Sequence, residues 1–292
     1  MGETRIDYHR DAVLFRSALG FTAAQTGFSE RLIEKDYFCS VALADLCASD
    51  DTEIVFKGGT CLSKVHADFF RLSEDLDFSL STPIDASRTR RSRRLDGFKR
   101  HFAAVSNRCD CFRIDQPLLG FNNSLQYGAR LAYRSVISGQ DDFLKVEVSV
   151  REPIVEPYVS LPARTVLLDP FRKAAAVKPF AIRVLTPREA YAEKLRAALS
   201  RRDPAIRDFF DLDHAFGVGS VNASDDSLIR LLRDKLAVSA NKPIDVSAAK
   251  LARLRAQVDT DLRPVIREAD FQRFDVDRAF QRVADLAAIL NG

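Results

Sequence analysis

The sequence has 292 residues, of which 46% are hydrophobic and 29% charged, and it contains no tryptophan. These values are typical of globular proteins and exclude the disordered, collagen-like and disulfide-framework classes. The 44 lysines and arginines nearly balance the 41 acidic residues, so the net charge of +3 excludes a basic coat over the whole surface but allows a local basic patch.

The N-terminal segment and the cysteines bear on location. The chain begins MGETRIDYHRD, which is charged and lacks the apolar stretch of a signal peptide. No uninterrupted apolar run approaches the ~18 residues that a membrane span needs. The five cysteines form no CxxC pair, which favours a reducing compartment. We therefore expect a cytoplasmic protein without a membrane partner.

A helix, a short strand and a second helix are expected first, at residues 29–48, 54–56 and 60–70. Ser29 is a candidate N-cap of the first helix. Gly58 and Gly59 lie between the strand and the second helix, which gives the order strand, glycine turn, helix.

The next segment alternates in polarity from Asp75 to Leu80. Successive side chains of a strand point to opposite faces, so Leu76 and Phe78 are expected to face the core while Asp75 and Asp77 share the other face. The pattern therefore places two carboxylates side by side.

Residues 87–107 are helix-compatible and hold a concentration of positive charge. One acid, Asp96, stands against seven cations: Arg88, Arg90, Arg91, Arg93, Arg94, Lys99 and Arg100. We assign Arg90, Arg91, Arg93 and Arg94 as candidates for binding an RNA backbone. A solvated helix face or a surface for docking a partner protein is an equal alternative.

Further strands are expected over residues 128–137, 143–150 and 164–168, among several β-like segments between Cys111 and Leu185. The apolar residues of the second take one face, and Glu147 lies on the other with Lys145. A third carboxylate is thereby placed on a strand.

The pattern changes to helices after Leu185. Thr186 and Glu189 form a capping box, with a proline at the first helical position. Further helices are expected from Asp203 to near Gly217 and over 225–238, 247–260 and 274–290. We expect two domains, residues 1–185 and 186–292.

Glycines at a strand-to-helix turn let backbone N–H groups approach phosphate oxygens, and Thr60 adds a hydroxyl. The two aspartates of a D-x-D strand can bridge hard cations that clamp the oxygens of a displacement at phosphorus, and Glu147 could complete the shell. In isolation, each motif is more often an ordinary tight turn or a solvated strand face.

The order of these motifs resembles the DNA polymerase β-like nucleotidyltransferase superfamily and, more closely, the AbiEii nucleotidyltransferase toxins of type IV toxin–antitoxin and abortive-infection systems. The resemblance rests on Glu34-Lys35-Asp36-Tyr37, on Lys57-Gly58-Gly59-Thr60 continued through Lys64 to Ser73-Glu74-Asp75-Leu76-Asp77, on Lys145-Val146-Glu147, and on Glu193-Lys194 followed by Arg207-Asp208 and Asp211. One departure is Ala205, where the family's fourth motif has an arginine; Arg201 or Arg202 could substitute.

The resemblance implies an α+β core, with a mixed, mostly antiparallel sheet flanked by helices, followed by a helical C-terminal domain. It implies catalytic residues at Asp75, Asp77, Glu147, Lys194, Asp208 and Asp211, the first three holding metal. It places the nucleotide at Lys57, Gly58, Gly59, Thr60, Lys64 and Ser73.

The function implied is transfer of a nucleotidyl group from a nucleoside triphosphate, with two Mg²⁺ ions, to an acceptor hydroxyl at the 3′ end of tRNA. Translation would then be blocked, and a cognate antitoxin is expected. The alternatives are a nucleotidyltransferase acting on a small molecule or a protein, and a catalytically silent module that binds RNA or protein. Retention of D-x-D, Glu147 and the Glu193-Lys194 pair argues against the silent module.

Overall fold

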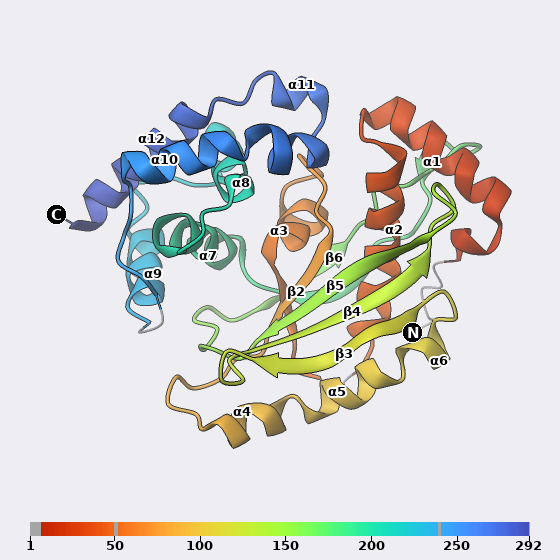
Figure 1. Cartoon of the computed structure of the whole chain (residues 1–292), viewed down its shortest axis with the longest axis horizontal. Helices are drawn as coiled ribbons and strands as arrows, with labels where there is room; N and C mark the ends of the chain where they lie inside the picture. Colours follow the sequence, from red (N-terminus) through yellow and green to blue (C-terminus); the bar gives the residue numbers. More distant parts are fainter. Residues whose placement is uncertain (1–6, 50–51, 239–240, 292) are drawn as a thin grey trace. The chain divides into compact units, whose positions relative to one another are not determined.

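The computed structural model describes residues 7–49, 52–238 and 241–291. By its internal contacts the chain divides into two compact units, residues 1–185 and residues 186–292. The first unit is built on a β-sheet and the second on helices (Figure 1). The α+β class expected from the sequence is confirmed.

Within the described residues, the first unit holds a seven-stranded sheet in the order β3-β4-β5-β2-β1-β9-β6. The neighbours β2 and β5 are parallel, as are β1 and β9, and the remaining pairs are antiparallel. The strands are β1 (Val55–Lys57), β2 (Asp75–Ser79), β3 (Arg113–Phe121), β4 (Gln126–Arg134), β5 (Asp141–Ser149), β6 (Val159–Ala163) and β9 (Phe180–Val184), beside a small ribbon of β7 (Leu168–Asp169) and β8 (Ala174–Ala175).

Three helices of this unit, α1, α2 and α4, begin at a side-chain cap, which is Asp11, Ser29 and Ser87 respectively. Ser29 accepts a hydrogen bond from the Leu32 amide at 3.4 Å, as expected for the N-cap of α2. The helical elements are η1 (Tyr8–Arg10), α1 (Ala12–Thr26), α2 (Glu30–Leu46), α3 (Gly58–Cys61), the π-helical turn η2 (Leu62–His66), α4 (Arg88–Arg94), α5 (Asp96–Ala103) and α6 (Val105–Arg108).

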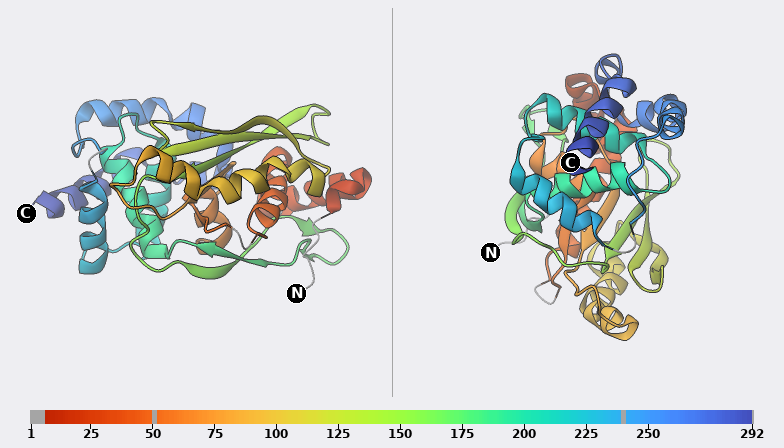
Figure 2. Two further views of the ribbon diagram at one scale, coloured as in Figure 1. Left: turned by 90° about the horizontal axis from the view of Figure 1, so that it is seen from below. Right: turned by 90° about the vertical axis from the view of Figure 1, so that its left-hand side faces the viewer.

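One face of the sheet is apolar and covered. The Phe38 ring of α2 stacks on Tyr133 of β4 at 4.0 Å, and the Phe98 ring of α5 lies 6.0 Å from Phe78 of β2. Helices α4, α5 and α6 follow one another beside the β3–β4 hairpin (Figure 2). Leu76 and Phe78 point into this covered face. Because side chains alternate along a strand, Asp75 and Asp77 point to the opposite, polar face.

Two expected elements differ from the structure. The helix expected over 60–70 ends at His66, and Asp68 and Phe69 take left-handed backbone conformations with φ of 47° and 54°. The strand expected over 164–168 is mostly a loop, because the Val166 amide donates to Asp36 of α2 at 3.0 Å and this bond draws the chain away from the sheet. The preceding residues form β6 instead.

Both edges of the sheet carry a proline. The edge strand β3 contains Pro117, and its pairing with β4 shifts between Ile114 and Gln116 and again before Leu119. The other edge strand, β6, contains Pro162. A proline has no backbone N–H to donate, so neither edge offers a regular ladder to another strand.

The second unit is helical. Thr186 caps α7 by accepting from the Glu189 amide at 3.2 Å, with Pro187 at the first position, as the sequence predicts. Its core includes the stacked rings of Phe209 and Phe280, 6.0 Å apart. The elements are α7 (Pro187–Ser200), α8 (Ile206–Gly217), α9 (Asp226–Leu236), α10 (Ala248–Ala256), η3 (Val258–Leu262), η4 (Arg263–Val265), α11 (Glu268–Phe271) and α12 (Val276–Asn291). None of the described helices is long and apolar enough to cross a membrane.

Candidate functional site

Charged residues of three neighbouring strands meet on the polar face of the sheet. In the register of β1, β2 and β5, Asp77 lies between Lys57 and Glu147. Asp75 lies beside Lys145 in the adjacent row. Paired residues of neighbouring strands project to the same side, so the sheet gathers these five side chains, here called the polar-face cluster.

The glycine turn is shaped around the Asp77 carboxylate. Gly58 has a φ of 77°, and a Cβ added there would lie 2.3 Å from Asp77 Oδ2. Any L side chain at this position would therefore be strained and would also displace the carboxylate. The glycine turn and the D-x-D strand therefore fit together as one unit of structure, although Gly59 and Asp75 are 16 positions apart in the sequence.

The side chains of Arg71, Ser73 and Thr60 support the glycine turn. A Cβ on Gly59 would lie 2.6 Å from Arg71 Nη2 and 3.0 Å from Ser73 Oγ, so both groups fill the space that this glycine leaves. Thr60 donates its hydroxyl to the Asp75 carbonyl at 2.5 Å. Arg71 was not singled out by the sequence, and its position two residues before Ser73 is the signal that could have found it.

Lys145 and Glu147 form an ion pair on β5, with 3.0 Å between Lys145 Nζ and Glu147 Oε1. Partial burial lowers the pKa of Lys145, but the hydrogen bond with Glu147 and the charges of Glu147, Asp75 and Asp77 outweigh it and raise the pKa. The ammonium is therefore held among three carboxylates.

The donor chemistry of this cluster suits a hard divalent cation. Carboxylate oxygens are the ligands that Mg²⁺ prefers, and the space at Gly58 admits the Asp77 carboxylate beside the turn. Across residues 7–49, 52–238 and 241–291, however, no three His, Cys, Asp or Glu side chains form a ready group for a metal. Of these carboxylates, Glu147 is engaged by Lys145.

Lys64, expected at the phosphates, is placed elsewhere by the structure. Its side chain is fully buried, and Nζ lies 2.5 Å from Asp36 Oδ1 and 2.7 Å from Ser40 Oγ. An ammonium enclosed in this way cannot reach a ligand unless a buried ion pair opens. The structure thus corrects this expectation: Lys64 joins η2 to α2.

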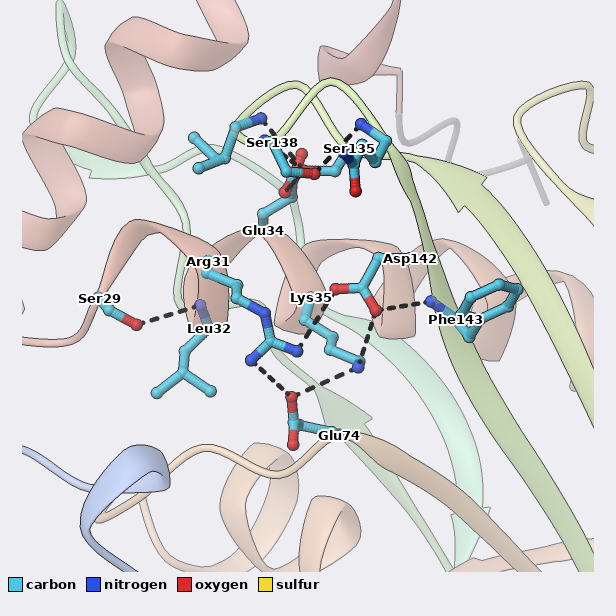
Figure 3. A network of polar contacts seen from close by, with 12 residues as sticks. Ser29, Arg31, Leu32, Glu34, Lys35, Glu74, Ser135, Ser138, Asp142 and Phe143 are labelled. Atoms are coloured by element: carbon cyan, nitrogen blue, oxygen red, sulfur yellow. Dashed lines mark hydrogen bonds and ion pairs between the residues drawn. The ribbon is translucent and has the colours of Figure 1, made fainter. Parts of the chain in front are cut away.

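Asp36 belongs to a run of three buried charges on α2, Glu34, Lys35 and Asp36, here called the α2 triplet. Figure 3 shows Glu34 and Lys35 with their partners. Glu34 accepts from Ser135 Oγ and the Val136 amide, each at 2.6 Å. Burial raises the pKa of Glu34, and these hydrogen bonds oppose the rise without cancelling it.

Lys35 lies 3.4 Å from Glu74 Oε1 and 3.3 Å from Asp142 Oδ1, and Arg31 reaches the same two carboxylates (Figure 3). Glu74 immediately precedes Asp75, and Asp142 lies near the start of β5. Lys35 and Arg31 therefore fix the starts of both strands that carry the polar-face carboxylates.

The second unit brings three predicted catalytic residues together. Lys194 Nζ of α7 lies 2.6 Å from Asp208 Oδ1 and 2.7 Å from Asp211 Oδ2, both on α8. Burial raises the pKa of Asp208, but the charges of Lys194 and Arg201 outweigh it and hold the pKa below its usual value. Both Asp208 and Asp211 are buried, while 12% of the Lys194 side chain is exposed.

Two neighbouring contacts complete this cluster. Arg201 Nη1 lies 3.2 Å from Asp208 Oδ2, so Arg201 supplies a guanidinium here although Ala205 cannot. Lys235 of α9 has a buried ammonium that pairs with two carboxylates of α7. Its Nζ lies 3.2 Å from Glu193 Oε1 and 2.8 Å from Glu189 Oε1. These ion pairs join α7 and the residue that follows it to α8 and α9.

The basic helix α4 divides into two kinds of arginine. Arg91 is buried and donates to the Asn123 carbonyl at 2.8 Å and to the Ser124 carbonyl at 3.3 Å, which holds the β3–β4 turn. Arg94 pairs with Glu53 at 2.7 Å. Arg90 and Arg93 are exposed. Of the four predicted RNA contacts, Arg91 is thus committed to the fold.

A family model described as "Nucleotidyl transferase AbiEii toxin, Type IV TA system" matches residues 41–286. Two crystal structures from Helicobacter pylori are similar over 96% of this chain at 17% identity: a candidate nucleotidyltransferase, with 94% of its chain covered and a TM-score of 0.46, and JHP933, with 91% covered and a TM-score of 0.47. No curated protein matches the chain.

Proposed function

Because the chain belongs to the AbiEii family of nucleotidyl transferase toxins of type IV toxin–antitoxin systems, we propose that it transfers a nucleotidyl group to the 3′ end of tRNA. The acceptor oxygen forms a bond to the α-phosphorus of a nucleoside triphosphate while the bond to the bridging oxygen breaks, and pyrophosphate leaves. The hydroxyl proton passes to a carboxylate of the polar-face cluster. Nucleotides added to tRNA would block translation, and a cognate antitoxin would restrain the toxin.

One observation carries the proposal: the register that aligns Asp75, Asp77 and Glu147 on one face, with Asp77 against the Gly58 turn. Mg²⁺ held by Asp75 and Asp77, and by Glu147 once it leaves Lys145, would neutralise charge on the phosphate oxygens.

The other predicted nucleotide-binding residues act through the turn. The amides of Gly58 and Gly59 would donate to phosphate oxygens, and Lys57 would add a cation beside Asp77. Ser73 and Thr60 fix the turn, since Ser73 packs against Gly59 and Thr60 bonds to the Asp75 carbonyl. The proposed role of these residues is to orient the triphosphate.

Lys194 is proposed to neutralise charge that develops as pyrophosphate leaves. Asp208 and Asp211 would keep its ammonium charged and oriented until then, because both carboxylates contact Nζ within 2.7 Å. Their proposed role is positional, through Lys194.

RNA would be held through its phosphates. Arg90 and Arg93 of α4 are exposed, and such cations give backbone-led binding that weakens as salt rises. We propose these two residues, rather than Arg91, as part of the acceptor surface.

The test is incorporation of each α-labelled nucleoside triphosphate into total tRNA by the purified protein with Mg²⁺, beside an EDTA control and Asp77→Asn. Label on tRNA that disappears in both controls is expected. Label on a small molecule or on a protein instead would replace the acceptor and keep the enzyme. Metal-independent RNA binding without any transfer would overturn the proposal in favour of a silent binding module.

A further inference from the structure

The proposed reaction gives no role to Lys145, although this residue belongs to the polar-face cluster. Strand alternation places it on the same face as Glu147, and the register sets it beside Asp75. Its ammonium lies 3.0 Å from Glu147 Oε1, and 54% of its side chain is exposed. It is therefore mobile enough to change partners without unfolding a strand.

The surrounding charges explain why a cation is needed at this point. Asp75, Asp77 and Glu147 occupy adjacent positions on two paired strands, and three like charges so placed repel one another. A divalent cation would remove that repulsion, and in its absence the ammonium of Lys145 removes part of it. The same Glu147 oxygens would have to serve both cations.

We propose that Lys145 is the counter-ion that a divalent metal displaces from Glu147, and that the freed ammonium then contacts a phosphate oxygen of the nucleotide. The inference rests on the proposed function, because it assumes metal at the three carboxylates.

The first test measures metal binding without nucleotide, through loss of the electron paramagnetic resonance signal of free Mn²⁺ on titration with protein. Lys145→Met removes the competing charge and keeps the aliphatic stem. It is expected to bind Mn²⁺ about fivefold more tightly than wild type, the size of effect that a partly exposed ion pair supports.

Two variants serve as controls for this titration. Lys145→Arg keeps the positive charge and is expected to retain the wild-type affinity for Mn²⁺. Lys178→Met removes one exposed lysine from the segment before β9 and makes the same change in net charge. It is also expected to leave the affinity for Mn²⁺ unchanged. This control distinguishes competition between Lys145 and the metal for Glu147 from an effect of the protein's net charge.

The second test measures nucleotide binding at saturating Mn²⁺, with a triphosphate analogue that carries a methylene bridge between the α- and β-phosphorus. Lys145→Met is expected to bind the analogue about tenfold more weakly, because one charge-assisted contact is lost. A gain in metal affinity together with a loss in nucleotide affinity is a result that a purely structural role would not give.

If Lys145→Met bound Mn²⁺ as weakly as wild type or more weakly, the inference would be overturned. The metal site of the proposed function would still stand, provided that Mn²⁺ binding by wild type depends on Asp77. If neither wild type nor Lys145→Met bound Mn²⁺ in a manner that depends on Asp77, the proposed metal site and this inference would both be overturned.

Discussion

The α2 triplet and the polar-face cluster contain the same kinds of residue in opposite settings. Every member of the α2 triplet is at most 8% exposed, and each is matched to partners on other elements. The polar-face cluster is half-buried or exposed, and its ion pair at Lys145 is open to solvent. The contrast teaches that residue type alone does not distinguish a charged side chain enclosed by the fold from one that solvent can reach, whereas burial does.

The largest effect is expected at the polar-face cluster. Asp77→Asn should lower nucleotidyl transfer by about a thousandfold or more, since it removes a charge proposed to bind metal and leaves the fold in place. Incorporation of label into tRNA measures the loss, and circular dichroism checks the fold. Asp85→Asn, in an exposed segment, is the matched control. Equal loss in both variants would contradict the assignment.

The next effect is expected on stability, at Lys64. Lys64→Met leaves the Asp36 carboxylate buried without its ammonium, which should lower the free energy of unfolding by about 3–5 kcal/mol. Urea denaturation measures this change, with Lys178→Met as reference. Unchanged stability combined with a raised KM for the nucleotide would instead return Lys64 to the phosphates, where the sequence alone had put it.

A smaller effect should separate two arginines of one helix. Arg93→Ala is expected to weaken RNA binding about threefold and to reduce the salt dependence by about one phosphate contact. Arg91→Ala is expected to lower stability by about 2 kcal/mol, because carbonyls of the β3–β4 turn lose their donor. Filter binding across salt concentrations and urea denaturation distinguish the two. If the two variants had the same RNA affinity at each salt concentration and the same stability, burial would not distinguish an RNA contact from a structural role.

The smallest effect concerns pH at Asp142. Burial raises the pKa of this carboxyl, but the Phe143 amide and the cations Lys35 and Arg31 outweigh it and lower the pKa. The charged form therefore stabilises the fold above the pKa of the unfolded chain, about 3.9, and that contribution is lost as the pH falls through the native pKa. The stability difference between wild type and Asp142→Asn should be constant near pH 7 and shrink below about pH 4. A difference that grows with acid would contradict this.

Local patterns in the sequence predicted much of the fold. Ser29 and Thr186 cap the helices expected to follow them, because a cap depends on residues within one turn. The alternation at Asp75 and Asp77 correctly gives β2 and its two faces, since one strand determines it. The facing of Glu147 follows from the same rule.

Other features depend on residues far apart in sequence. The strand β3 contains Pro117 and Gly120 and becomes a strand only by pairing with β4. Burial of Lys64 requires Asp36 and Ser40 of α2 around its ammonium. No local spacing encodes such contacts, which is why the phosphate role of Lys64 was expected and its ion pair was not.

The prolines at the two edges of the sheet bear on how an antitoxin could recognise this toxin. A partner that adds a strand needs a run of backbone donors and acceptors along an edge. Pro117 interrupts that run on β3, where the pairing is also irregular, and Pro162 interrupts it on β6. Addition of a strand by a partner is thereby disfavoured at both edges, so that a partner which docks there would be recognised through side chains. Surface substitutions could then change which antitoxin is accepted without altering the sheet.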